Sequence, residues 1–283
     1  MTTRRTFIST ASTLAASLFA FHPSLYASSG GRKLKNIGFI SGIIGKELKG
    51  DWQAILKKTV EFGFTEIEPG NYLGDSAASF LAFCKEIGLK PVAKGISFNA
   101  KADVLKKEIE GIHQLEIKNA ILYWPWLVGG PFGLEDCKKS AEILNKTGRI
   151  CRENGLTLCW HNHNKEFIPM EAGLPFDYLM SQTERDLVQC ELDIYWVAKG
   201  GADPLAVLKK YRGRIKILHV KDMAPGTEQT FECPGSGIID FPTVFKEALH
   251  QGIEHFIVEH DTVKDGMACL QSSGAYLRNL TIP

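Results

Sequence analysis

The sequence predicts an α/β fold of one domain, a closed (β/α)8 barrel of the TIM type, over residues 31–283. Short apolar runs rich in β-branched residues alternate with amphipathic segments from residue 35 onward. The alternation gives eight strand candidates and eight helix candidates, which is the number that closes such a barrel. The length also fits, because these barrels use about 250 residues as one unit.

The predicted strands are short runs of mainly apolar residues bounded by turn-forming ones. They cover residues 36–41, 64–68, 90–96, 119–123, 156–161, 187–193, 215–219 and 255–259. Strands that alternate with helices pair in parallel through right-handed crossovers. No GxGxxG motif follows the first strand, so an open dinucleotide-binding sheet matches the sequence poorly.

The predicted helices fill the intervals between the strands. They cover residues 51–62, 76–87, 101–117, 134–154, 175–184, 203–211, 240–251 and 265–279. Asp51, Ser76 and Asp203 stand at N-cap positions, where a side-chain oxygen accepts a free backbone N–H. Glycines at positions 63, 88, 155 and 252 separate a helix from the next apolar run, and we expect them to end the helix in the left-handed conformation.

The composition is that of an ordinary globular protein without a bias toward polyanionic partners. Hydrophobic residues make up 44%, charged residues 23%, and the formal net charge is +1. We therefore expect neither nucleic acid nor an anionic membrane surface as a partner. The seven cysteines are widely spaced and form neither a disulfide framework nor a CxxC zinc pattern, so we expect buried thiols.

The first 30 residues differ from the rest of the chain. Arg4 and Arg5 precede a mild apolar stretch that runs to Phe21, and small residues follow near Ala27. This order is typical of an export signal, and the arginine pair resembles the twin-arginine type. The apolar stretch is shorter than the roughly 18 residues of a membrane span, so we expect a cleaved signal and no anchor. The sequence thus predicts a periplasmic or otherwise exported protein.

Polar side chains gather at the carboxyl ends of four successive predicted strands. The fifth strand ends in an HNH run that starts at His161, and the next three end near Asp193, His219 and Glu259. Barrel active sites are built at these ends, and closure brings the four side chains together. A mixed N/O set suits Mn, Co, Zn or Mg, so we expect one divalent metal. His161 and His163 share a side of the strand, and either is a candidate ligand.

Three further side chains near the same ends are candidates for proton transfer: His163, Glu166 and Lys221. His163 and Lys221 each lie two residues from a predicted ligand, so they should face the same space. Lys221 could also hold a substrate oxygen as a point charge. The alternative is a surface lysine paired with Asp222.

Candidate substrate contacts lie just beyond other strands. Glu68, at the end of the second predicted strand, could bind a sugar hydroxyl. Trp124 and Trp196 follow the fourth and sixth strands, where aromatic faces suit the C–H surface of a sugar, and Trp126 is a further aromatic candidate. The alternative for each aromatic residue is packing beneath the loops.

Five short motifs follow one another along the chain. They are His161-Asn162-His163, Leu192-Asp193, His219-Val220-Lys221-Asp222, the GxGxIDF loop at 235–241, and Val258-Glu259. In this order they resemble the xylose isomerase-like barrels, often called sugar phosphate isomerase/epimerase proteins, over residues 35–280. The resemblance implies one divalent metal ion, often Mn, held by Glu, Asp, His and Glu.

The match to that ligand set is incomplete at its first position. Asp193, His219 and Glu259 match the last three ligands, whereas His161 stands where a glutamate is usual. This departure resembles a subgroup that includes inosose dehydratases and keto-sugar lyases.

The resemblance implies chemistry on a small-molecule carbohydrate, with the metal as a Lewis acid that stabilises an enediolate. Because sugar phosphates are intracellular, we expect an exported protein to act on an unphosphorylated sugar. If the enediolate is reprotonated on carbon, the protein is an isomerase or epimerase, which is the expected function. Loss of a β-oxygen, as in a keto-sugar or glycoside lyase or dehydratase, is the alternative. A non-catalytic sugar-binding barrel is an alternative of another class, and a homo-oligomer is compatible with the sequence.

Overall fold

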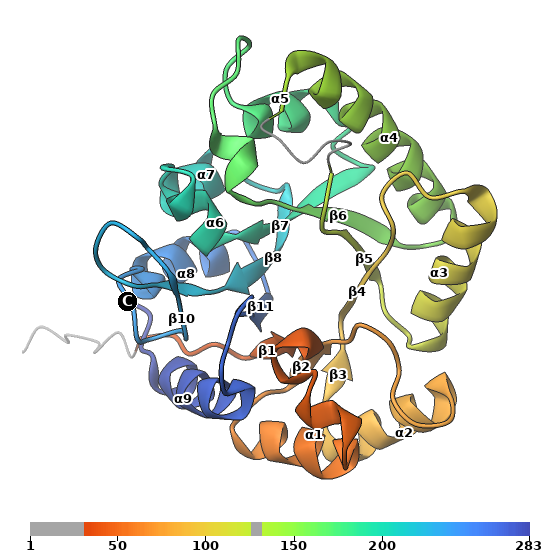
Figure 1. The fold of residues 1–283 in the computed structure, drawn as a ribbon, viewed down its shortest axis with the longest axis vertical. Coiled ribbons are helices and arrows are strands. Elements are labelled where there is room, and N and C mark those ends of the chain that lie inside the picture. Colours follow the sequence, from red (N-terminus) through yellow and green to blue (C-terminus); the bar gives the residue numbers. More distant parts are fainter. Residues whose placement is uncertain (1–30, 126–131) are drawn as a thin grey trace, which may run out of the picture. The chain divides into compact units, whose positions relative to one another are not determined.

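The computed structural model describes residues 31–125 and 132–283 (Figure 1). The predicted export signal, residues 1–30, and the candidate Trp126 lie outside the described residues. The unit Gly31–Pro283 carries every element named below. Within the described ranges, no helix has both the length and the apolar character needed to cross a membrane.

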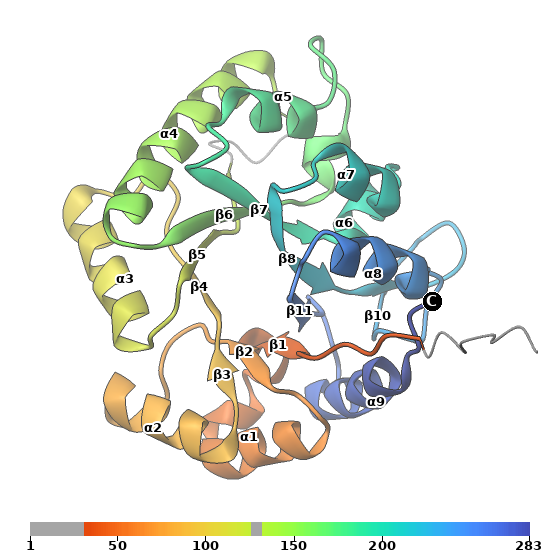
Figure 2. The ribbon, with the colours of Figure 1, turned by 180° about the vertical axis from the view of Figure 1, so that it is seen from behind.

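Parallel strands form the centre of this unit, surrounded by helices (Figure 1, Figure 2). The strands are β1 (Gly38–Ile40), β2 (Glu66–Glu68), β3 (Lys90–Pro91), β4 (Ala93–Gly95), β5 (Asn119–Leu122), β6 (Thr157–His161), β7 (Val188–Asp193), β8 (Ile215–Val220) and β11 (His255–Val258). They pair in the order β3-β2-β1-β11-β8-β7-β6-β5-β4. Only Val92 separates β3 from β4, so the two ends of this order belong to one bent strand and the barrel closes. The predicted strands and fold class are confirmed.

The predicted helices are also confirmed. They are α1 (Trp52–Glu61), α2 (Ala77–Ile87), α3 (Ala102–Gln114), α4 (Leu134–Glu153), α5 (Pro175–Gln182), α7 (Pro204–Lys210), α8 (Phe241–His250) and α9 (Gly266–Asn279). Asp51, Ser76 and Asp203 cap α1, α2 and α7 as expected. The four joint glycines all have positive φ. A short helix, α6 (Ile194–Lys199), and a small hairpin of β9 (Asp222–Met223) and β10 (Phe231–Glu232) were not predicted.

The barrel interior changes from apolar to polar along the strands. An apolar cluster fills it and consists of Val92, Ala93, Ile121, Cys159, Ile217 and Ile257. Side chains two residues apart on a strand share a face. The next inward positions after those of β6, β8 and β11 are therefore His161, His219 and Glu259. The alternation of inward and outward side chains along each strand thus places polar groups at the carboxyl-terminal mouth of the barrel.

Cys233 and Cys269 form a disulfide, with their Cα atoms 5.6 Å apart. This finding corrects the expectation of thiols only. The two residues are 36 positions apart and form no recognisable spacing motif, so their pairing depends on the fold. The cysteines at 84, 137, 151, 159 and 190 are buried thiols, as predicted.

The GxGxIDF loop wraps around the carboxylate of Asp222. Asp222 Oδ2 accepts hydrogen bonds from the backbone N–H groups of Gly235 and Gly237, at 3.0 and 2.9 Å, and Oδ1 accepts one from Ile239 at 3.1 Å. A Cβ atom on Gly237 would lie 2.3 Å from the backbone oxygen of Met223, so only glycine fits. Asp222 is therefore a structural anchor of this loop.

Candidate metal centre and active site

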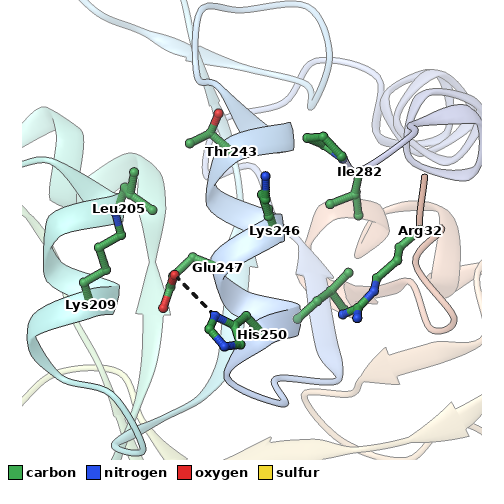
Figure 3. A pocket seen from close by; sticks show the side chains of 10 residues that line it. Arg32, Leu205, Lys209, Thr243, Lys246, Glu247, His250 and Ile282 are labelled. Carbon is green, nitrogen blue, oxygen red and sulfur yellow. Dashed lines mark ion pairs between the residues drawn. The ribbon is translucent and has the colours of Figure 1, made fainter. Parts of the chain in front are cut away.

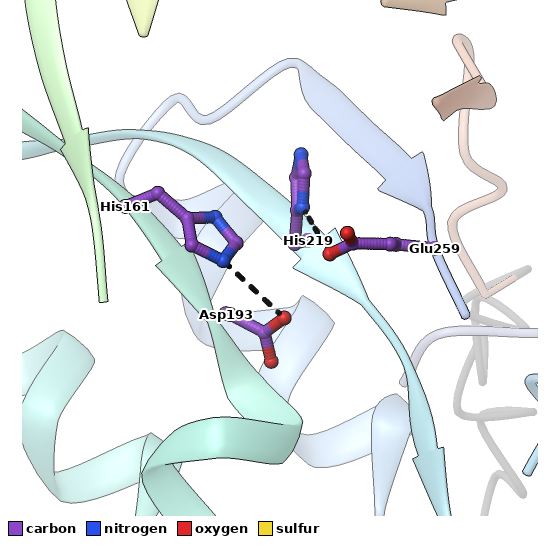
Figure 4. A group of neighbouring side chains, drawn as sticks. All are labelled: His161, Asp193, His219 and Glu259. Carbon is purple, nitrogen blue, oxygen red and sulfur yellow. Dashed lines mark hydrogen bonds and ion pairs between the residues drawn. The ribbon is translucent and has the colours of Figure 1, made fainter. Parts of the chain in front are cut away.

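The four predicted metal ligands come together at the mouth of the barrel (Figure 4). His161 ends β6, Asp193 ends β7, His219 lies in β8 and Glu259 follows β11. One nitrogen or oxygen atom from each lies within 4.8 Å of the others. Asp193 and His219 are fully buried, whereas the side chain of Glu259 is 16% exposed. Two nitrogens and two carboxylate oxygens in this space match the donor set of a divalent metal.

Hydrogen bonds hold Asp193 so that one oxygen faces the cluster. Its Oδ1 accepts from the Trp196 backbone N–H at 2.9 Å, which caps α6. The side chain of Asn162 donates to the backbone oxygen of Asp193 and accepts from its N–H, and so joins β6 to β7. Asp193 Oδ2 accepts no hydrogen bond; it lies 3.1 Å from Lys221 Nζ and 3.8 Å from His161 Nε2. A buried oxygen of this kind is suited to a cation.

Carboxylates contact both imidazoles of the cluster. Glu191 Oε2 lies 3.1 Å from His161 Nδ1, whereas Glu191 Oε1 lies 3.2 Å from His219 Nε2 but accepts no hydrogen bond. His219 instead bonds to Glu259 Oε2 through Nδ1, at 2.8 Å, and to Glu68 Oε2 through Nε2, at 3.1 Å. His161 thus has one nitrogen paired with a buried carboxylate, and its other nitrogen, Nε2, lies 3.8 Å from Asp193 Oδ2. Metal-binding histidines are commonly fixed by such outer carboxylates.

The structure places Glu68 against His219, and its predicted role as a sugar contact stays a prediction. Glu68 is fully buried, and its Oε2 lies 3.1 Å from His219 Nε2. The hydroxyl group of Tyr123 donates a hydrogen bond to the other oxygen of Glu68. Both carboxylate oxygens are thus engaged inside the barrel, where Glu68 contacts one of the predicted metal ligands. Glu68, Glu191 and His219 form a second group with metal-binding atoms.

Lys221 lies among carboxylates at the barrel mouth and is fully buried. Its Nζ lies 3.1 Å from Asp193 Oδ2, 3.1 Å from Glu259 Oε2 and 2.5 Å from Asp261 Oδ2. Burial alone would lower the pKa of Lys221, but these three carboxylates outweigh it and raise the pKa. The alternative of a surface lysine paired with Asp222 is wrong. Lys221 is a buried ammonium group beside the predicted metal position.

The buried cluster has more carboxylates than cations to balance them. Burial, followed by the charge of Glu68, raises the pKa of Glu191 to about 8. Burial likewise raises the pKa of Asp193 to about 6, although Lys221 opposes it. The ionised forms of both groups would be stabilised by additional positive charge in this space. The residues present therefore fit a divalent cation.

His163 adjoins the cluster and is flanked by indole rings. Its ring stacks on Trp124 with centroids 4.0 Å apart and lies 5.4 Å from the ring of Trp196. Burial, with a smaller contribution from Lys221, lowers the pKa of His163 to about 3, so the imidazole is neutral. His161, and not His163, belongs to the group of four with clustered ligand atoms. Trp124 is 54% exposed.

Glu166 was predicted as a proton-transfer residue, and that role stays a prediction. It is fully buried, and its Oε2 accepts a hydrogen bond from the His163 backbone N–H at 3.0 Å. This contact caps the short 3-10 helix Asn164–Phe167. Glu166 is absent from both groups of clustered metal-binding atoms among the described residues. It therefore shapes the loop that carries His163.

Three contributors to the site were missed from the sequence: Glu191, Tyr123 and Asp261. Glu191 precedes Asp193 by two residues in β7, so strand alternation places both on the inner face. Asp261 follows Glu259 by two residues and binds Lys221. Lys221 was identified because it lies two residues from a predicted ligand. The same spacing could have identified the carboxylates of Glu191 and Asp261.

A separate cavity of about 500 Å³ lies between α7 and α8 (Figure 3). Its lining includes Arg32, Lys209, Lys246 and His250, and His250 Nδ1 lies 4.0 Å from a Glu247 carboxylate oxygen. None of the predicted site residues lines this cavity. The candidate chemistry belongs to the barrel mouth.

The fold and the cluster define a closed parallel α/β barrel with metal-binding residues at the carboxyl ends of its strands. The model of one family, the xylose isomerase-like TIM barrel, matches residues 56–279. The chain belongs to this family, and the resemblance seen in the sequence is confirmed.

Curated relatives match only part of the chain. An inosose dehydratase of Clostridium beijerinckii is 32% identical over 143 residues, which are 45% of this chain and 47% of that protein. An inosose dehydratase of Klebsiella pneumoniae is 35% identical over 133 residues, which are 41% of this chain and 44% of that protein. The chain thus matches about half the length of these relatives.

Solved structures match almost the whole barrel. A sugar phosphate isomerase/epimerase from Parabacteroides distasonis has a TM-score of 0.75 at 23% identity, and the match covers 91% of this chain and 97% of that one. The IolI protein with a bound zinc atom has a TM-score of 0.67 at 15% identity, over 85% of this chain and 95% of that one. At these identities the structures establish the fold.

Proposed function

We propose that this protein is a divalent-metal-dependent enzyme that removes a proton from the carbon beside the carbonyl of an unphosphorylated sugar. The observation that carries the proposal is the buried group of His161, Asp193, His219 and Glu259 at the barrel mouth, with Lys221 beside it. Relatives named inosose dehydratase and neighbours named sugar phosphate isomerase/epimerase support a sugar substrate. The zinc atom of the IolI protein supports a metal, for which manganese and zinc are the first candidates.

A divalent cation held by the four residues would supply a Lewis acid that stabilises negative charge on a sugar oxygen. The chain supplies an acid and a base. Lys221 keeps its proton because three carboxylates surround it, so it can donate to an oxygen that gains negative charge. His163 is neutral and can accept a proton.

The fate of the deprotonated sugar decides the reaction. Return of the proton to the other face, or to the neighbouring carbon, gives an epimerase or isomerase. Expulsion of a β-oxygen gives a dehydratase or lyase, and the inosose dehydratase relatives favour this second candidate. Both outcomes begin with the same proton transfer, so one experiment tests the common step.

The common step is tested by hydrogen exchange in deuterated water. Metal-loaded protein is incubated with free and 3-keto sugars, and products are analysed by mass spectrometry. We expect deuterium in the sugar carbon beside the carbonyl, and either an isomer or a product that has lost an oxygen substituent. The Glu259→Gln variant should lose the exchange together with the metal. Sugar binding without exchange, for every sugar and metal, would establish a non-catalytic binding barrel.

We also propose export through residues 1–30. The Cys233–Cys269 disulfide supports it, because disulfides persist in oxidising compartments. Replacement of Arg4 and Arg5 by lysine should retain the uncleaved precursor in the cytoplasm, since the receptors for this signal read the arginine pair. Unchanged delivery and processing of the double variant would exclude the twin-arginine route. A double Lys33→Arg and Lys35→Arg variant is the matched control.

A further inference from the structure

A second cavity, of about 770 Å³, opens beside the metal centre at the carboxyl-terminal mouth. Its walls come from α6, from the β9–β10 hairpin and from the segment after β11. Of the described side chains, its lining includes none of the four predicted metal ligands. Whole ligand pockets measure about 300–1,000 Å³, so this space is large enough for a substantial part of a substrate. We call it the aromatic subsite, after Tyr195, Trp196, Phe231 and His260.

The aromatic subsite borders the predicted reaction centre directly. Lys221 Nζ, which contacts Asp193 and Glu259, lies 5.2 Å from the ring centroid of Trp196 and 5.3 Å from that of Phe231. A molecule bound at the cluster would therefore reach these rings through any substituent that points toward α6 and β10. The subsite is thus positioned to hold the remainder of a substrate whose reacting ring lies at the metal centre.

The walls of this subsite are fixed by hydrogen bonds. The Tyr195 hydroxyl group donates to the backbone oxygen of Gln229 at 2.8 Å, and Lys199 Nζ donates to that of Glu228 at 2.5 Å. The β9–β10 hairpin is consequently held against α6. Phe231 also packs on Tyr195 and Trp196, with centroids 4.7 and 5.4 Å apart. A wall ordered in this way loses little conformational entropy when it binds a ligand.

The lining combines aromatic faces with hydroxyl and carboxylate groups. Aromatic faces cover the C–H surfaces of a pyranose ring, whereas carboxylate and threonine oxygens accept hydrogen bonds from its hydroxyl groups. Charge is balanced, because Lys199 and Lys264 accompany Glu228 and Glu232. Lys199 is already bonded to backbone oxygens, and the described side chains that line the cavity include no arginine. These features suit an uncharged polyhydroxylated ring and not a phosphate group.

We propose that the aromatic subsite binds a second, uncharged sugar ring, so that the substrate is a glycoside of at least two rings. This inference rests on the proposed function, because the first ring is the sugar placed at the metal centre. It specifies the substrate class and assigns Phe231, Glu232 and Thr262 to its recognition.

The test is calorimetric binding to the metal-loaded, full-length protein, which requires no turnover. The probes are glucose, methyl glucoside and a set of glucose disaccharides, each also in its 3-keto form, with glucose 6-phosphate as the anionic probe. At least one disaccharide should bind about tenfold more tightly than the matching methyl glycoside, equivalent to about 1.4 kcal/mol. Phe231→Leu keeps an apolar side chain without the ring, and it should bring the ratio of the two affinities close to one. Glu232→Gln should reduce the ratio partly.

Val104→Ala, an exposed apolar position on the outer helix α3, is the control and should leave the ratio as in the unmodified protein. Monosaccharide binding with no gain from any second ring would overturn the subsite and leave the proposed function intact. Absence of binding by every sugar would overturn both. Tighter binding of glucose 6-phosphate than of any disaccharide, lost in Lys264→Met, would show that the cavity is an anion site and overturn the inference.

Discussion

Glu191 Oε2 lies 3.1 Å from His161 Nδ1, and this contact leaves His161 Nε2 facing Asp193 Oδ2 at 3.8 Å. A carboxylate at Nδ1 favours the tautomer that carries its hydrogen there and a lone pair on Nε2. That tautomer is the one able to bind a metal through Nε2. The other oxygen of Glu191 lies 3.2 Å from His219 Nε2 without accepting a hydrogen bond, and Glu68 Oε2 is the hydrogen-bond partner of that nitrogen.

The first prediction concerns this carboxylate. Glu191→Gln should lower metal affinity by about 10–100-fold, because the amide replaces the carboxylate that pairs with His161 Nδ1 and so lowers the basicity of that imidazole. The measurement is a competition titration of Mn²⁺ or Zn²⁺ against a chromophoric chelator. Glu153→Gln, at the exposed end of α4, is the control and should bind metal like the unmodified protein. Equal affinity in both variants would assign Glu191 to packing only.

The second prediction settles which histidine of the HNH motif binds the metal. His161→Ala should lose most of the bound metal, as should Asp193→Ala, because both residues belong to the clustered group of four. His163→Ala should keep the metal, since its ring is held between indoles. Elemental analysis of the purified variants measures the metal directly. Retention in His161→Ala with loss in His163→Ala would reverse the assignment.

The strands and the metal-binding residues could be predicted because they depend on local pattern. Asp193 and His219 end runs of apolar residues, and the period of two assigns their inward direction. The contact of Glu68 with His219 could not be predicted, because the two residues lie 151 positions apart and meet only when the barrel closes. The disulfide and the aromatic subsite also depend on contacts between distant segments. The sequence pattern therefore predicts which side chains point into the barrel, whereas the contacts among them depend on barrel closure.

The third prediction concerns pH and Glu166. Burial raises the pKa of Glu166 well above its usual value, and its Oε1 lacks a hydrogen-bond partner. The carboxyl group of Glu166 therefore stays protonated to a higher pH in the folded protein than in the unfolded chain, where the pKa of glutamate is about 4.3. Above that value the folded state binds more protons than the unfolded state, so the free energy of unfolding falls as pH rises toward the folded pKa.

Glu166→Gln removes this titration. The variant should lose less stability than the unmodified protein as the pH rises above the titration range of an unfolded glutamate. Urea denaturation at several pH values measures the difference, and the exposed Glu153→Gln again serves as the control. Parallel pH profiles for the Glu166 variant and the unmodified protein would show that Glu166 is ionised in the folded state.

The fourth prediction separates proton transfer from metal binding at Lys221. Lys221→Met preserves the length of the side chain and removes its charge from the vicinity of Asp193, Glu259 and Asp261. Metal affinity should be kept or increased, because a cation that competes for the same carboxylates is gone. Turnover, measured as solvent exchange into the sugar, should fall by about 10²–10⁴-fold.

Lys216→Met is the matched control, since this lysine lies in the same strand but is exposed. Thermal unfolding shows whether the Lys221→Met variant is folded. If the variant is folded and binds metal but has lost turnover, the loss is due to the missing ammonium group. Asp261→Asn provides a second measure. Asp261 is partly exposed and contacts Lys221. Asp261→Asn should therefore leave the ammonium group in place but position it less well. Turnover should fall by less than in Lys221→Met. Full turnover in Lys221→Met would remove Lys221 from the acid/base pair and leave the metal centre without its proposed proton donor.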